Sequence, residues 1–210
     1  MDHQIPLADL IEQKLEFILE QIPIDVNTWE IKNVSTNPPL LVGKKIFSNC
    51  DVPCFLGMGT VKKTKPEQLM NFIWDVYQDP IQMKKSDPDI AEYQILDTVN
   101  DHTRICHQVN NLSWPLWQRD MVYCQSKIIH ENSCWLIMFS MQSEKAPRSD
   151  DKYVRALVHI SAYGFVPDDD HCTVYRFAHV DPAGYIPTSL LNSYGDKTVT
   201  MIKEMQQQFL

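Results

Sequence analysis

Residues 90–180 contain six consecutive β-prone segments with no helical pattern between them. Each segment is rich in the branched and aromatic side chains that favour strands, and turn-forming residues separate them. Parallel strands need long crossover connections, usually a helix, and no such pattern interrupts this region. We therefore expect antiparallel strands over residues 90–99, 103–109, 121–129, 134–141, 153–165 and 172–180.

Apolar residues recur at helical spacing in three other parts of the chain. One stripe follows Pro6 and ends before Pro23, which predicts an N-terminal helix. The capping pattern that begins at Thr64 precedes a second stripe, which predicts a middle helix ending near Tyr77. Pro187 opens a third stripe, where we expect one long amphipathic helix at the C-terminal end.

The remaining segments complete the order of elements. Two Asp-Pro pairs, at 79–80 and 87–88, are expected to break the chain after the middle helix. Between the first two helices we expect three short strands, over residues 29–34, 41–47 and 55–61. Helices at both ends and in the middle, separated by runs of strands, place the chain in the α+β class.

Size and charge exclude several classes of function. With 210 residues, 44% of them hydrophobic, one domain over residues 1–210 can bury roughly 70% of its extended-chain surface and fold as a monomer. Acidic residues outnumber basic ones by 27 to 19, for a net charge of −8. This sign is wrong for binding a phosphate backbone, so we expect no nucleic-acid partner.

The cysteines and the N-terminal sequence favour a cytoplasmic protein. The first residues lack the features of a secretory signal, and no apolar segment approaches the length of a membrane span. Six cysteines are dispersed through apolar segments, which is typical of reduced core thiols. Cys50, Cys54 and the later pair His171-Cys172 do not complete a zinc-ligand set. We therefore expect no metal site and no cofactor.

Several short motifs occur in a fixed order between these elements. They are Trp29, Trp74-Asp75-Val76, Arg119-Asp120, Val154-Arg155-Ala156 and Asp181-Pro182-x-Gly184-x-Ile186-Pro187, followed by Leu190, Leu191 and Asn192. In this order and at these spacings, the chain resembles the START domain, the lipid-carrying module named after the steroidogenic acute regulatory protein. The resemblance extends over nearly the whole chain.

The resemblance implies a helix-grip fold. Such a fold has a curved antiparallel sheet, here of about nine strands, wrapped around the long C-terminal helix, together with the N-terminal and middle helices. It also implies that one phospholipid, sphingolipid or sterol occupies an internal cavity under the C-terminal helix. Most of the matching motif residues suit turns, caps and a paired charge at the sheet end, so we expect them to build the fold and not to touch the ligand.

Strand alternation and the resemblance together indicate which side chains face the lipid. After Arg119-Asp120, residues 121, 123 and 125 share the inward side of their strand. The positions that hold a buried charge pair in sterol-carrying members correspond to Gln108 and Gln125 here. The positions of the choline cage in phosphatidylcholine carriers correspond to His107, Met121 and His159. The two glutamines, with Tyr123 and Arg104, suit a neutral or zwitterionic lipid better than a strongly anionic one, whereas the changed cage positions argue against choline recognition. The cavity candidates are Arg104, His107, Gln108, Met121, Tyr123, Gln125, His159, Tyr175, Leu191 and Tyr194.

The resemblance places a gate at the C-terminal helix and the loop beside it. Gly195 lowers the intrinsic stability of that helix, and Met201 supplies adaptable packing. The loop over residues 110–117 is unusually apolar and carries Trp114 and Trp117. Its tryptophans either pack beneath the C-terminal helix or contact a membrane interface.

We interpret the chain as a lipid-binding and lipid-transfer protein that acts in the cytoplasm and contacts membranes transiently. One alternative is a lipid-sensing interaction module that moves nothing between membranes. A second is a helix-grip enzyme acting on a hydrophobic substrate. The sequence has no nucleophile-elbow motif and no paired catalytic carboxylates, so we do not expect an enzyme.

Overall fold

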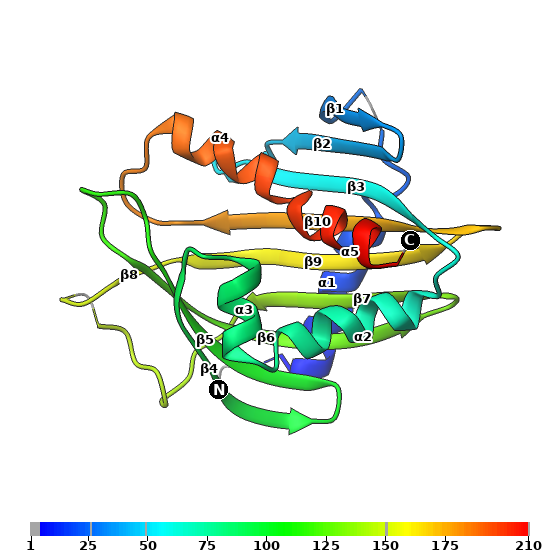
Figure 1. The fold of residues 1–210 in the computed structure, drawn as a ribbon. Coiled ribbons are helices and arrows are strands. Elements are labelled where there is room, and N and C mark those ends of the chain that lie inside the picture. The colour runs from blue at the N-terminus through cyan, green and yellow to red at the C-terminus, as the bar shows by residue number, and fades with distance from the viewer. Residues whose placement is uncertain (1–4, 26, 49, 150, 210) are drawn as a thin grey trace.

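A ten-stranded sheet forms the centre of the computed structural model, which describes residues 5–25, 27–48, 50–149 and 151–209 (Figure 1). The strands lie in the order β1-β2-β3-β10-β9-β7-β6-β5-β4, and β8 pairs with β6 outside this path. Their bounds are β1 (Glu30–Thr36), β2 (Pro39–Lys45), β3 (Cys54–Lys62), β4 (Ile90–Asn100), β5 (Thr103–Asn110), β6 (Arg119–His130), β7 (Ser133–Ser140), β8 (Val154–Arg155), β9 (Leu157–Pro167) and β10 (His171–Asp181).

The antiparallel prediction is confirmed for every neighbouring pair along the main path of the sheet. The predicted strand over residues 153–165 is wrong in one respect, because it divides at Ala156. The short β8 pairs in parallel with β6, whereas β9 pairs with β7 and β10. Ala156 is buried at the division, and its N–H donates to the Asp120 carbonyl at 2.8 Å.

Helices cover both faces of the sheet (Figure 1). The structure has α1 (Leu7–Leu19), α2 (Pro66–Val76), α3 (Pro80–Ser86), α4 (Thr188–Lys197) and α5 (Thr200–Gln208). Side chains on β7 alternate: Leu136 and Met138 face α2 and α5, whereas Trp135 and Ile137 face α1. We call the first side the cavity face and the second the outer face. No helix in the described part of the chain is both long and apolar enough to cross a bilayer.

Two helix predictions before β4 need correction. Thr64 does not cap α2, since its Oγ1 donates to the Lys62 carbonyl at 2.8 Å. The Lys65 N–H instead donates to Gln68 Oε1 at 3.1 Å, and the helix begins at Pro66. The predicted break over residues 79–88 contains α3. Asp79 Oδ1 accepts from the Ile81 N–H at 2.8 Å, and a proline in the first turn needs no N–H partner.

The C-terminal helix is also interrupted, because α4 ends before Thr198 and α5 begins at Thr200. Both the N–H and the Oγ1 of Thr198 donate to the Gly195 carbonyl, at 3.2 and 2.6 Å, which tightens the turn. The same turn lies directly on β3. A Cβ atom at Gly57 would be only 2.7 Å from the Thr198 carbonyl oxygen, so glycine at this position permits the contact.

A buried ion pair joins two of the sequence motifs on the outer face. The Arg155 guanidinium donates two hydrogen bonds to Asp120, at 2.9 and 2.8 Å, and His107 Nε2 lies 3.1 Å from the same carboxylate. Burial alone would raise the pKa of Asp120, but the hydrogen bonds from Arg155 and His107 hold it below its ordinary value. The paired charge expected at the sheet end is therefore present, and it binds β8 to β6.

We predict that Asp120→Asn lowers the free energy of unfolding by on the order of 3 kcal/mol, because it leaves the Arg155 charge without its partner. Folding lowers the pKa of Asp120. The stabilisation that the ionised carboxylate provides is therefore fully present above its unfolded-state pKa of ~3.9 and is lost as the pH falls through its folded-state pKa. Chemical denaturation at several pH values measures both effects.

Asp97→Asn is the matched control, because Asp97 forms an exposed ion pair with Lys145. This variant should lower the free energy of unfolding by less than about 1 kcal/mol at neutral pH. Equal costs for the two variants would contradict the structural role of the Asp120 pair.

Candidate functional site

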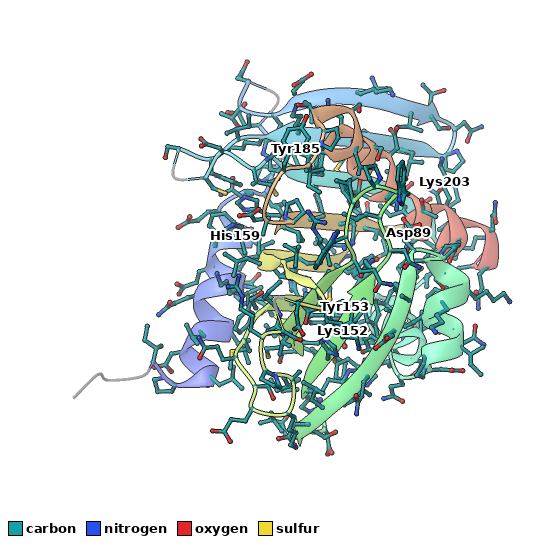
Figure 2. All side chains as sticks on the ribbon, turned by 90° about the vertical axis from the view of Figure 1, so that its left-hand side faces the viewer. Asp89, Lys152, Tyr153, His159, Tyr185 and Lys203 are labelled. Atoms are coloured by element: carbon teal, nitrogen blue, oxygen red, sulfur yellow. The ribbon has the colours of Figure 1, made fainter. Side chains whose placement is uncertain are left out.

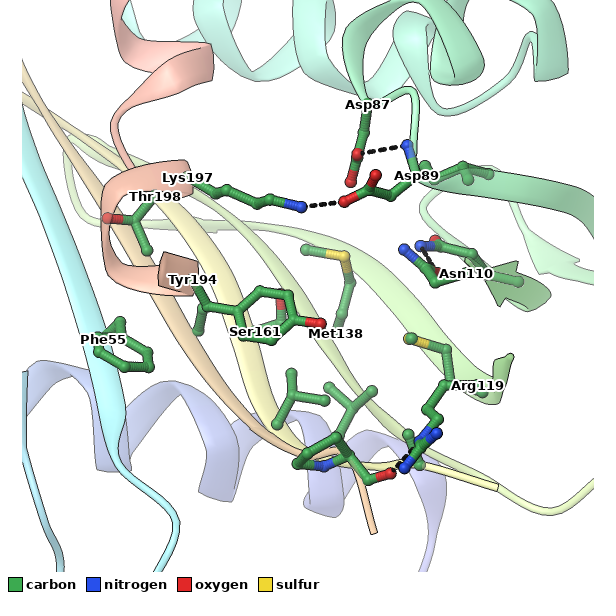
Figure 3. A pocket seen from close by; sticks show the side chains of 18 of the residues that line it. Phe55, Asp87, Asp89, Asn110, Arg119, Met138, Ser161, Tyr194, Lys197 and Thr198 are labelled. Carbon is green, nitrogen blue, oxygen red and sulfur yellow. Dashed lines mark hydrogen bonds and ion pairs between the residues drawn. The ribbon is translucent and has the colours of Figure 1, made fainter. Parts of the chain in front are cut away.

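A cavity of about 430 Å³ lies between the cavity face of the sheet and α4 (Figure 3). This volume is within the usual range for a small-molecule site. Its polar lining includes Gln108, Asn110, Arg119, Tyr123, Ser161 and Arg176. Its apolar lining includes Phe55, Met83, Met121, Met138, Val158, Ala178, Val180 and Leu191. The predominance of apolar side chains suits a hydrophobic ligand with a few polar groups.

Three polar side chains form a hydrogen-bonded series in the wall of the cavity. Tyr123 Oη donates to Gln108 Oε1 at 2.9 Å, and Gln108 Nε2 donates to Asn110 Oδ1 at 2.7 Å. Burial raises the pKa of Tyr123 well above its ordinary value, so the phenol remains a donor at neutral pH. These contacts hold the Gln108 amide in one orientation.

Arg176 on β10 is a cavity residue that the sequence reasoning missed. Its guanidinium lies 4.5 Å from the centre of the Tyr163 ring and donates to the Phe177 and Ala162 carbonyls. In the described ranges, no carboxylate forms a salt bridge with it. Alternation along β10 provides the missing signal, because Arg176 shares the side of Ala178 and Val180.

Five of the predicted cavity residues line this cavity: Gln108, Met121, Tyr123, Leu191 and Tyr194. Met201, which was predicted to belong to the gate, lines it as well. Gln125 and Arg104 also lie on the cavity face, but the end of α2 covers them. Arg104 donates to Gln125 Oε1 at 2.6 Å and to the Trp74 carbonyl at 3.1 Å. Gln108 and Gln125 therefore do not act as a pair, since each has a different partner.

Three predicted cavity residues, His107, His159 and Tyr175, lie on the outer face. His107 binds Asp120, and the Tyr175 ring stacks with Phe177. His159 lies beside α1 (Figure 2), in a separate pocket with Lys14 and Phe17. The placement of His107 is a one-residue error in strand phase, because Gln108 next to it faces the cavity.

The two C-terminal helices are attached to the sheet differently. α5 buries Ile202 and Met205 completely, whereas Gly195 is the buried residue of α4. Gly195 lets α4 pack closely on the sheet, because a Cβ atom there would be only 3.0 Å from Phe55 Cδ1. This close packing differs from the expected role of Gly195 as a residue that weakens the helix. At its end, α4 is held by an ion pair between Lys197 and Asp89, whose side chains are each nearly half exposed (Figure 3).

Arg119 connects the apolar loop to the segment that leads into α4. Its guanidinium donates to the carbonyls of Trp117, Pro182 and Ala183, at 2.6, 2.9 and 3.0 Å. Three aromatic side chains in these two segments are exposed to solvent: Trp114 is 92% exposed, Trp117 56% and Tyr185 82%. Figure 2 shows Tyr185 at the surface. Neither tryptophan is packed beneath the C-terminal helix, although Leu112 of the same loop lines the cavity.

Comparison with known proteins supports the fold and the family. The model of the START domain matches residues 41–210. The ceramide transfer protein of Mus musculus is 27% identical over 154 residues, which are 63% of this chain and 24% of that protein, and its Xenopus laevis counterpart is 21% identical over 90% of this chain and 33% of its own length. The chain therefore spans a quarter to a third of the length of these curated relatives.

Solved structures share the fold at low sequence identity. Human StAR-related lipid transfer protein 5 superimposes with a TM-score of 0.77 at 17% identity, covering 96% of this chain and 95% of that one. Human STARD10 gives a TM-score of 0.75 at 19% identity, covering 97% and 80%. These likenesses show the fold, and the match of the START domain over residues 41–210 shows that the chain belongs to the START domain family.

Proposed function

We propose that this chain, residues 1–210 acting as one unit, binds a single lipid in the cavity beneath α4 and carries it between membranes. The observation that supports this most strongly is the apolar cavity itself, which α4 covers. Burying an acyl chain there contributes on the order of 0.8 kcal/mol per methylene, so a few polar contacts suffice to select the headgroup. The names of two relatives, both ceramide transfer proteins, agree with this role.

The polar lining favours a neutral or zwitterionic lipid that bears hydroxyl, amide or ester groups. The Tyr123–Gln108–Asn110 series offers both donors and acceptors, as such groups require. Arg176 adds a charge-assisted donor for a carbonyl or phosphate oxygen.

The proposal is tested by titration with fluorescent ceramide, phosphatidylcholine and sterol analogues. At least one of them should saturate at one molecule per chain. Absence of binding to all three classes would overturn the proposal.

The polar series should also determine affinity. We predict that Tyr123→Phe weakens binding of the preferred lipid about threefold to tenfold, because one hydrogen bond contributes roughly 0.5–1.5 kcal/mol. Tyr93→Phe is the matched control. Its hydroxyl, also buried, donates to Cys106 Sγ at 3.2 Å and does not line the cavity, so affinity should stay within about twofold. Equal effects of the two variants would contradict the assigned contacts.

We infer that α4 is the lid and α5 its anchor. Surface ion pairs such as Lys197–Asp89 contribute about 1 kcal/mol or less, so α4 can detach at low cost while the buried side chains of α5 hold the chain end in place. The turn at Thr198 between the helices is the hinge. Trp114, Trp117 and Tyr185 lie in the segments linked by Arg119 and supply the membrane contact, since exposed indole and phenol rings favour the interface.

Locking the lid should stop transfer. In a Cys50→Ser background, Asp89→Cys and Lys197→Cys can be joined by a short bis-methanethiosulfonate, which links the two thiols through disulfides, releases methanesulfinate and is cleaved by a reductant, because the other five cysteines are buried. We predict at least a tenfold slower transfer between vesicles when the link is present and recovery after cleavage. Each single-cysteine variant, treated in the same way, is the control.

Bound lipid should remain in the linked protein. Unchanged transfer with a confirmed link would rule out this lid. Binding without transfer in the unlinked protein would instead support a lipid-sensing module.

A further inference from the structure

A second pocket, of about 320 Å³, lies on the outer face against α1. Three potential metal ligands line it: Cys50 from the connection before β3, His159 from β9 and His179 from β10. One ligand atom from each lies within 4.8 Å of the other two. Residues from three separate segments therefore converge at one point, which the spacing along the sequence does not indicate.

The distances match those of a zinc site. Cys50 Sγ lies 3.6 Å from His159 Nε2. Zinc–sulfur and zinc–nitrogen bonds of about 2.3 and 2.05 Å at a tetrahedral angle place these atoms about 3.6 Å apart. The rings of His159 and His179 stack with their centres 4.6 Å apart, so a shift of the order of 1 Å brings the third ligand into range.

The hydrogen bond of the second histidine leaves one ring nitrogen available for a metal. His179 Nε2 lies 3.1 Å from the Val52 carbonyl, which can only accept, so this nitrogen carries the hydrogen. The lone pair is then on Nδ1. Metal-bound histidines commonly donate their other N–H to a backbone carbonyl in this way. Burial lowers the pKa of both His159 and His179, which keeps the rings neutral, as metal binding requires.

Two charged side chains act on this cluster with opposite effects. Lys14 of α1 disfavours a cation there, whereas Asp181 at the end of β10 favours one. Burial lowers the pKa of Lys14, which reduces the cost of converting it to the neutral amine.

We propose that Cys50, His159 and His179 form a zinc site with three protein ligands and a fourth position open to the pocket. On binding, zinc displaces the thiol proton of Cys50, which passes to solvent, and forms a bond to the thiolate sulfur. The ion would join the segment before β3 to β9 and β10. Val52 and Pro53 of that segment line the lipid cavity, so the ion also steadies one wall of it.

The test uses the whole chain after removal of metal by a chelator. Titration with zinc chloride should give one ion per chain with micromolar or tighter affinity. Cobalt chloride should produce the near-ultraviolet thiolate–cobalt band, and zinc should protect Cys50 from alkylation, since it is the one cysteine in the described ranges that is not buried. Cys50→Ser and His159→Gln should each weaken zinc binding at least tenfold.

His102→Gln, at an exposed turn, is the matched control and should leave zinc affinity unchanged. The cobalt spectrum and the alkylation assay need only the wild-type chain, so misfolding of a variant cannot mask the result. Absence of saturable zinc binding, absence of the thiolate–cobalt band, or equal binding by Cys50→Ser and the wild type would overturn the proposal.

Discussion

The contact between the C-terminal segment and strand β3 determines where the cavity lies. Glycine at position 57 lets the backbone of Thr198 lie directly on the strand. From this point α5 continues into the core with fully buried side chains, whereas α4 covers the space over the sheet with Leu191 and Tyr194. The cavity is the space that α4 covers and does not fill.

The free energies of these contacts differ in a way that suits exchange of a ligand. Apolar burial holds α5 and the sheet, and removing such contacts costs several kcal/mol. α4 is held by exposed ion pairs, Lys197–Asp89 and Lys32–Asp196, which contribute about 1 kcal/mol each or less, and by the packing of Gly195 against Phe55. An opening movement can therefore involve α4 without unfolding the sheet. Arg119 joins the segment before α4 to the exposed tryptophan loop through three carbonyl contacts.

Local patterns predicted the main strands and helices in their order, because alternation and helical spacing follow directly from burial, and the family resemblance added which face of β6 points inward. They failed where a three-dimensional contact decides the outcome. The turn at Thr198 depends on its approach to β3, and the cover over Gln125 depends on Arg104 and the end of α2. The grouping of Cys50 with two distant histidines depends on strand order, which the spacing along the chain does not contain.

In the proposed function, the cavity beneath α4 holds the lipid, and the pocket against α1 does not. A ceramide or phosphatidylcholine analogue with a photoreactive diazirine in its acyl chain tests it directly, with the labelled residues mapped by mass spectrometry. We predict labels on cavity-lining residues of β9, β10 and α4, such as Val158, Val180 and Leu191. Labels confined to the pocket around Phe17 and His159, or to the exposed surface, would contradict the account.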